Sequence, residues 1–284
     1  MSVSVDLTAQ PASDRPAAPP AATRHGFIRL PKPSHLRRFL VPVLLVLSWQ
    51  VAAQAGWIST RLMAPPLDIA AAAWSLTVTG ELPYHLLVSL QRVVIGLAIA
   101  IFAGVSLGLT AGLSKLGEDA VDASMQMLRA LPFLALVPLF ILWFGIGETT
   151  KIALVALGAT FPIYLTLFGG IRGVDPKLLE AGRILGLDRA GQIRHIILPA
   201  ALPQALVGLR YGLGTAWLSL VVGEQINATA GIGFLVMDAR EFLRTDVILV
   251  GLLVYALLGL GADQLVRMVE RRALAWRPSL VREG

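Results

Sequence analysis

Long blocks of apolar residues, separated by stretches that carry most of the charge, dominate the pattern of this chain. A helix that crosses the hydrocarbon core of a bilayer needs about 20 apolar residues in a row. Blocks near this length are expected to span a membrane at residues 39–58, 88–113, 130–147, 150–170, 201–223 and 247–266. Pro132 and Pro138 interrupt the third block, which membrane helices tolerate where neighbours satisfy the freed carbonyls. The pattern therefore predicts an all-α integral membrane protein with six transmembrane helices.

The segments around these blocks divide the chain into three parts. Residues 1–36 are rich in Pro, Ala and Ser and lack an apolar run of signal-peptide length, which favours a disordered cytoplasmic tail. Residues 37–272 are expected to form the membrane domain, and residues 273–284 a second cytoplasmic tail. Between the first two blocks, a short amphipathic helix is expected to begin at Pro66, to end by Gly80 and to lie on the outer membrane surface.

Composition and charge argue against a soluble domain and against nucleic-acid binding, and they predict the orientation of the chain in the membrane. Of the 284 residues, 56% are hydrophobic and 15% are charged, whereas a soluble domain has about 25% charged residues. The net charge of +6 does not indicate nucleic-acid binding, because the basic residues flank the apolar blocks. With the N-terminus in the cytoplasm, 18 of the 24 Lys and Arg residues fall inside, 4 fall outside, and Arg92 and Arg210 lie within spans. The bias of positive charge predicts that both termini are cytoplasmic.

The longest inside segment, between the fourth and fifth spans, has the clearest local signals. Asp175 can cap a helix that Gly186 stops. Asp188 can cap a second short helix that runs to about Ile197. The result is a basic, amphipathic helix–turn–helix suited to docking on another protein. Its attachment to two membrane helices argues against DNA binding.

This segment also resembles the signature loop of binding-protein-dependent ABC importer permeases. That loop reads Glu-Ala-Ala, three residues, Gly, nine residues, Ile, one residue and Leu-Pro. The corresponding positions here are Glu180, Ala181, Gly182, Gly186, Ile196, Leu198 and Pro199. Gly182 departs from the Ala that is usual in the family. The resemblance implies a type I ABC importer permease (MetI-like) fold, in which the coupling loop at residues 175–199 forms a cytoplasmic coupling helix and docks on a separate ATPase subunit.

The chain lacks the motif that it would need to bind nucleotide itself. A phosphate-binding loop requires Gly-Lys followed by Ser or Thr. None of the four lysines, Lys32, Lys115, Lys151 and Lys177, follows a glycine. We therefore expect no cofactor and no enzymatic activity in this chain, with ATP and Mg on the partner ATPase.

A serine hydrolase site and a metal site are both less well supported by the sequence. Residues 104–108 match the Gly-x-Ser-x-Gly pattern of serine hydrolases, but they lie inside an apolar block that contains no partner histidine. Gly104, Gly108 and Gly112 instead recur every four residues, which favours close helix packing. The chain has no Cys and no two His at helical spacing, so no metal site is expected.

Six residues are candidates for a translocation path: Arg92, Arg210, Trp217, Ser219, Glu224 and Gln225. A charge inside a span is costly and usually functional, so Arg92 or Arg210 could attract an anionic solute. Snorkelling or pairing within the fold is the structural alternative. The polar residues from Glu224 to Asn227 could line the path or could mark a helix end that meets water.

Beyond the loop, the chain from about Ser89 to Arg272 resembles permeases for aliphatic sulfonates, taurine, nitrate and related small anions. The strongest parts are residues 89–93, 198–203, 208–214, 216–222 and 231–242. Residues 231–246 look most like the aliphatic sulfonate permeases.

This resemblance implies a machine in the cell inner membrane and in contact with its lipids. In that machine two permease chains, expected to be identical, work with two ABC ATPase subunits and a periplasmic solute-binding protein. Its expected solute is an aliphatic sulfonate, with taurine, nitrate or another small anion as the alternative. A passive channel or a membrane scaffold is the alternative from another class, but neither needs a docking loop of this pattern.

Overall fold

The computed structural model describes residues 34–60 and 62–276, and every regular element among them is a helix, as predicted. In chain order the elements are α1 (Ser34–Gln54), α2 (Pro66–Val78), α3 (Glu81–Leu113), α4 (Lys115–Ala130), α5 (Phe133–Phe144), α6 (Glu148–Arg172), α7 (Pro176–Ile184), α8 (Arg189–Gln192), the π-helical turn η1 (Ile193–Ile197), α9 (Leu198–Asn227), α10 (Ile232–Glu241) and α11 (Thr245–Ala273). Residues from 46 onward belong to one compact unit, and the first half of α1 belongs to another. The two predicted tails lie mainly outside the described residues.

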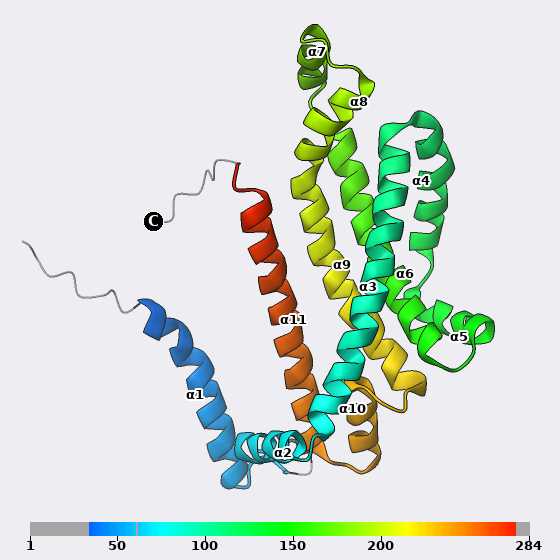
Figure 1. Cartoon of the computed structure of the whole chain (residues 1–284). Coiled ribbons are helices and arrows are strands. Elements are labelled where there is room, and N and C mark those ends of the chain that lie inside the picture. Colours follow the sequence, from blue (N-terminus) through cyan, green and yellow to red (C-terminus); the bar gives the residue numbers. More distant parts are fainter. Residues whose placement is uncertain (1–33, 61, 277–284) are drawn as a thin grey trace, which may run out of the picture. The chain divides into compact units, whose positions relative to one another are not determined.

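Helix α6 packs between α3 and α9, and these three long helices form the centre of the larger unit (Figure 1). The glycine face predicted on α3 is confirmed. A Cβ atom at Gly104 would lie 2.9 Å from Ile163 of α6, and one at Gly112 would lie 2.8 Å from Ile171. Gly108 lies between them against the same helix. Small residues at this seam allow the two backbones to approach closely.

The structure corrects the boundaries of the third predicted span, residues 130–147. The chain is already helical from Lys115, and α4 meets α5 at a bend of 103°. The bend has a local cause. Leu131 and Pro132 both have an extended backbone conformation, and a residue that precedes a proline rarely adopts the helical conformation. Helix α5 has 12 residues, a rise of about 18 Å, so it does not cross a core of about 30 Å by itself.

Helix α4 has a local start signal, because Ser114 accepts a hydrogen bond of 2.9 Å from the backbone N–H of Gly117. The polar side chains of α4 then find partners on α6. Glu118 forms an ion pair with Arg172 at the end of α6. Asp122 accepts a hydrogen bond of 2.8 Å from the hydroxyl of Tyr164. These contacts join residues more than forty positions apart, so the local sequence pattern does not reveal them.

Four helices in the described part of the chain are long and apolar enough to cross a membrane: Glu81–Leu113, Glu148–Arg172, Arg189–Ile226 and Thr245–Ala273. The bent pair of α4 and α5 would make a fifth span. The stretch Leu40–Gln54 of α1 is also apolar but is shorter. The count of six spans therefore stays a prediction.

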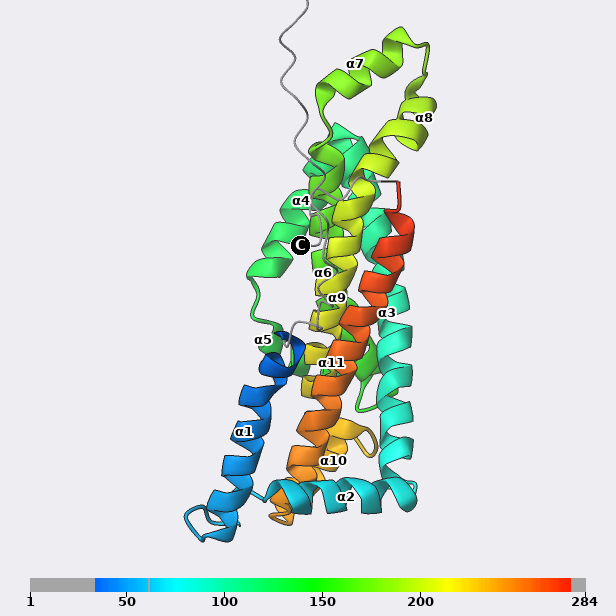
Figure 2. The same cartoon turned by 90° about the vertical axis from the view of Figure 1, so that its left-hand side faces the viewer.

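The short helices gather at the two ends of the long ones. Helices α2 and α10 lie at one end, and α7 and α8 project from the other (Figures 1 and 2). Helix α2 begins at Pro66 as predicted, and Gly80 follows it with φ 81°. Ile69 and Leu76 of α2 are buried in one cluster with residues of α10 and α11, so this helix is anchored to the bundle.

Candidate functional site

The projecting helix α7 is bounded by the two residues that the sequence indicated. Asp175 accepts a hydrogen bond of 2.9 Å from the backbone N–H of Lys177, which satisfies one of the free donors of the first turn. Gly186 follows the helix with φ 82°, a left-handed conformation that other residues rarely adopt. Both predicted signals are confirmed.

The sequence predicted a second, separate short helix that ends near Ile197, and this prediction is wrong. Asp188 does cap its start, accepting 2.7 Å from the backbone N–H of Gly191. The helix then continues through η1 into α9, so that Arg189–Ile226 is one run of 38 residues. The wider π turn ends at Ile197, two residues before Pro199. The ring of Pro199 disfavours a regular turn there, because it clashes with the carbonyl four residues back. The loop is thus physically continuous with the fifth predicted span.

Gly182, which stands where the family usually has alanine, is buried against the second arm of the loop. A Cβ atom at Gly182 would lie 2.6 Å from Cδ1 of Ile196 and 3.4 Å from Leu187. The side chain of Ile196 therefore occupies the space that a methyl group would fill. This contact closes α7 against the start of the long helix.

The tip of α7 presents apolar side chains to solvent. Ile184 and Leu185 are 86% and 82% exposed, and Glu180 and Ala181 are exposed on the same helix. Exposed apolar side chains next to charged ones are typical of docking surfaces. The base of the loop is fixed, because Arg189 donates a hydrogen bond of 3.1 Å to the carbonyl of Leu113 at the end of α3.

At the opposite end, Arg92 and Glu224 are buried against each other. Their exposed fractions are 3% and 1%. Arg92 donates to Glu224 at 2.7 Å through Nη1, and to both oxygens of Glu148 at 2.6 Å through Nε and Nη2. Lys151 completes this group with an ion pair of 3.0 Å to Glu148. Each of these charges therefore has an opposite charge in contact.

Glu224 also connects four helices. Its carboxylate accepts hydrogen bonds of 2.7 Å from Ser89 of α3, 2.8 Å from the backbone N–H of Gly233 in α10 and 3.2 Å from Tyr255 of α11. Sequence reasoning missed Ser89, Glu148 and Tyr255 as partners. No local signal marks these partners, because the contacts of this cluster join residues far apart in the sequence. Glu148 and Glu224, for example, lie 56 and 132 positions from Arg92.

Arg210 is paired as well, on the helix pair α9 and α11. Its guanidinium lies 2.5 Å from Glu270 and 3.3 Å from Asp263, and its side chain is 34% exposed. The ion pairs connect the interior of α9 to the second half of α11. This geometry matches the pairing alternative considered for Arg210 from the sequence.

The remaining path candidates do not converge. Ser219 is 3% exposed and faces Gly158 of α6, where a Cβ atom would lie 2.1 Å from its hydroxyl. Trp217 is half-buried against the apolar cluster between α3, α6 and α9. Gln225 is exposed. The structure thus brings Arg92 and Glu224 together and leaves the other candidates apart.

The sequence of this bundle, with its capped loop, can be compared with known proteins. The family of the binding-protein-dependent transport system inner membrane component matches residues 96–274. The chain belongs to this family. It is the permease subunit of an ABC importer in the inner membrane, and the ATPase is a separate subunit. Membership also implies a substrate-binding protein as a partner.

This permease is similar to several named relatives. It is 49% identical to the putative aliphatic sulfonates transport permease protein SsuC of Escherichia coli (strain K12), over 85% of this chain and 92% of that protein. It is 43% identical to the protein of the same description from Bacillus subtilis (strain 168), over 86% and 88%. It is 37% identical to the taurine transport system permease protein TauC of Escherichia coli (strain K12), over 82% and 86%.

Solved structures agree with the family in fold. The permease matches a crystal structure of an amino acid ABC transporter with histidines at a TM-score of 0.58 and 20% identity, over 69% of this chain and 97% of that chain. It matches an inward-facing structure of the MetNI methionine ABC transporter at 0.52 and 21%, over 64% and 93%. The predicted MetI-like permease fold is thereby confirmed.

Proposed function

We propose that this permease carries aliphatic sulfonates, a class of small organic anions, across the inner membrane. The observation behind this proposal is the order of similarity among named relatives. Identity is 49% and 43% to two permeases named for aliphatic sulfonates, 37% to a taurine permease and 28% to the nitrate import permease NrtB of Synechococcus elongatus. The higher identity supports an aliphatic sulfonate over taurine, nitrate or another small anion. A passive channel or a scaffold does not suit a member of this family.

The assembly in this proposal contains two copies of the permease, two ATPase subunits that hold ATP and Mg, and one periplasmic binding protein. Both permease termini lie in the cytoplasm, which the distribution of Lys and Arg supports. The membrane domain covers residues 37–272. The end that carries α2 and α10 then faces the periplasm.

Coupling in this proposal begins at the loop of residues 175–199. The exposed Ile184 and Leu185 dock on the ATPase, because an apolar tip of this exposure is stabilised by burial against a partner. Motion of the ATPase then enters the membrane through the continuous helix Arg189–Ile226. The permease alternates between an inward-open and an outward-open state as ATP binds and is hydrolysed.

Growth on a sole sulfur source tests the solute. A strain without this gene, and without another sulfonate transporter, should fail to grow on a short alkanesulfonate and should grow normally on sulfate. Restoring the gene should restore growth on the sulfonate. Unimpaired growth of the deletion strain on unsubstituted alkanesulfonates would reject the assignment to these solutes and would point to taurine, which is an amino-substituted sulfonate, to nitrate or to another anion.

A further inference from the structure

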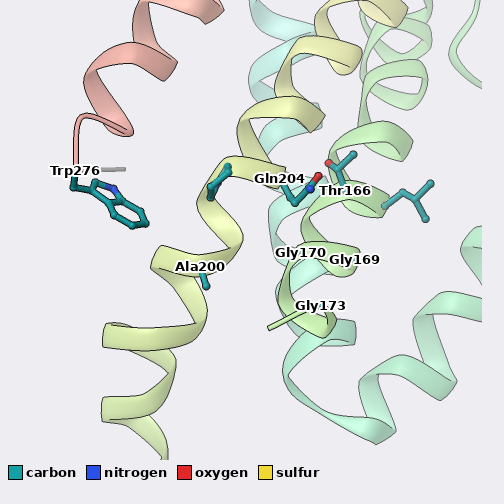
Figure 3. Close-up of a pocket in the computed structure, with 9 residues that line it drawn as sticks. Thr166, Gly169, Gly170, Gly173, Ala200, Gln204 and Trp276 are labelled. Carbon is teal, nitrogen blue, oxygen red and sulfur yellow. The ribbon is translucent and has the colours of Figure 1, made fainter. Parts of the chain in front are cut away.

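A cavity between α6 and α9 and a second cavity at the base of the loop of residues 175–199 differ in charge. The first has a volume of about 660 Å³. Figure 3 shows Thr166, Gln204 and Trp276 around it, together with glycines of α6. None of the described residues that line it is charged. It therefore has no side chain that would hold an ion by charge.

The cavity at the base of the loop has a volume of about 550 Å³ and a basic lining. Its lining includes Arg172 at the end of α6, Arg183 on α7 and Arg189 at the start of α8. Gln192 adds an amide, and the other lining residues are apolar or glycine. No carboxylate lines this cavity within the part of the chain that the structure describes. A hollow lined by charges of one sign concentrates ions of the opposite sign, so this lining favours an anion.

Two of the three arginines are held beside the end of α3. Arg172 donates a hydrogen bond of 3.4 Å to the carbonyl of Ala111, and Arg189 donates one of 3.1 Å to the carbonyl of Leu113. These carbonyls are two positions apart on one helix, so the two guanidinium groups lie close together. Arg172 also pairs with Glu118. Each guanidinium has more N–H donors than these contacts use, so donors remain for a ligand.

The third arginine, Arg183, has no partner. Its side chain forms no hydrogen bond and no ion pair with any residue in the described ranges 34–60 and 62–276. Asp175 and Asp188 of the same loop accept hydrogen bonds from backbone N–H groups instead. Glu180 lies one turn away on α7 but is not paired with it. The charges of Arg183 and Arg189 thus meet at one cavity without contact to a carboxylate.

We propose that this cavity binds a tetrahedral oxyanion group, of the sulfate or phosphate type, between Arg172, Arg183 and Arg189. Guanidinium groups match the oxygens of such a group with paired, charge-assisted hydrogen bonds. A free sulfate or phosphate ion carries this chemistry, and so does the phosphate of an anionic lipid headgroup. The cavity is open to both sources, because it borders the ends of the long helices α3 and α6.

A bound oxyanion would link the projecting loop to the helix bundle. Arg183 belongs to α7, whereas Arg172 is fixed to the ends of α3 and α6. An anion between them therefore holds the loop in one position relative to the long helices. Because the proposed function makes this loop the docking element for the ATPase, the anion sets the position from which it docks. The site itself follows from the geometry and does not depend on which solute is transported.

Sulfate binding to the full-length permease in nanodiscs of phosphatidylcholine tests the site. This lipid has no net charge, so it competes little for the arginines. Inorganic sulfate replaces chloride at constant ionic strength, and the thermal midpoint is followed, because a ligand of the folded state raises it with concentration. Arg183→Gln is compared with Arg194→Gln. Arg194 is also exposed on this loop and has no side-chain partner in the described part, but it does not line the cavity.

The native chain and Arg194→Gln should bind sulfate with similar affinity, and Arg183→Gln should bind it at least about tenfold more weakly. A hydrogen bond between charged groups is worth at least that factor. Sulfate also stabilises proteins in general by exclusion from their surface, so the difference between the two variants is the signal. Their midpoints in chloride should be equal, because Arg183 has no side-chain contact to lose.

The source of the oxyanion is separated by repeating the titration in nanodiscs of phosphatidylglycerol and by counting retained lipids with native mass spectrometry. Sulfate affinity that is the same in both lipids indicates a free ion. Weaker sulfate binding in phosphatidylglycerol, with more of this lipid retained by Arg194→Gln than by Arg183→Gln, indicates a headgroup. Equal sulfate binding and equal lipid retention by the two variants would overturn the site. Loss of sulfate binding when the ATPase is added would assign the arginines to the ATPase interface and would overturn it as well.

Discussion

The carboxylate of Glu224 accepts hydrogen bonds from side chains or backbone of α3, α10 and α11, so its position on α9 connects four helices. A buried charge of this kind is tolerated only when its lone pairs are fully occupied, as they are here. Arg92 depends on it in turn, because Glu148 satisfies only part of the guanidinium. The pair therefore maintains the packing of the end that carries α10.

Replacing Glu224 by Gln removes the charge and leaves the shape. Removing one partner of a buried ion pair costs about 3–5 kcal/mol, so Glu224→Gln should lower the thermal midpoint of the purified permease by several degrees. Glu241→Gln is the matched control, because Glu241 is exposed at the end of α10. Fluorescence-detected size-exclusion after heating measures both midpoints. Equal midpoints for the two variants would show that Glu224 does not hold these helices.

At the scale of elements, the loop and the fifth predicted span act as one body. Helix α7 folds back through Gly186 onto a helix that runs without interruption from Arg189 to Ile226. The contact between Gly182 and Ile196 closes the two arms. A force on the tip of α7 is thus delivered to the helix that carries both Arg210 and Glu224.

Gly186 offers a matched pair of substitutions that separates backbone conformation from size. Its φ is 82°, and a Cβ atom would meet nothing within 4 Å. A left-handed conformation costs an ordinary residue about 1–2 kcal/mol, whereas Asn adopts it more readily. Gly186→Val should therefore reduce co-purification of the ATPase, and Gly186→Asn should retain most of it. The coupling role of the loop is refuted if both variants bind the ATPase as well as the native chain.

The helix ends of this loop could be predicted because their causes are local. Asp175 and Asp188 cap the residues that directly follow them, and Gly186 sets its own φ. The helix at α4 was not predicted, because its acidic residues resemble a loop until Arg172 and Tyr164 of α6 are brought against them. The roles of Arg92 and Glu224 depend equally on partners distant in sequence, so the sequence identified them as candidates but not as a pair.

At the scale of the whole permease, features with different tasks lie at opposite ends of the long helices. The exposed apolar tip of α7 is at one end, and the buried charges beside α10 are at the other (Figure 1). This arrangement suits a subunit that receives motion on one side of the membrane and a solute on the other.

Uptake by proteoliposomes that contain the permease, its ATPase and the binding protein measures ATP-driven transport of the solute itself. A labelled short alkanesulfonate should accumulate only when ATP and all three proteins are present, with little competition from taurine or nitrate. Accumulation without ATP or without the binding protein would contradict the account, as would accumulation of taurine or nitrate in place of the sulfonate.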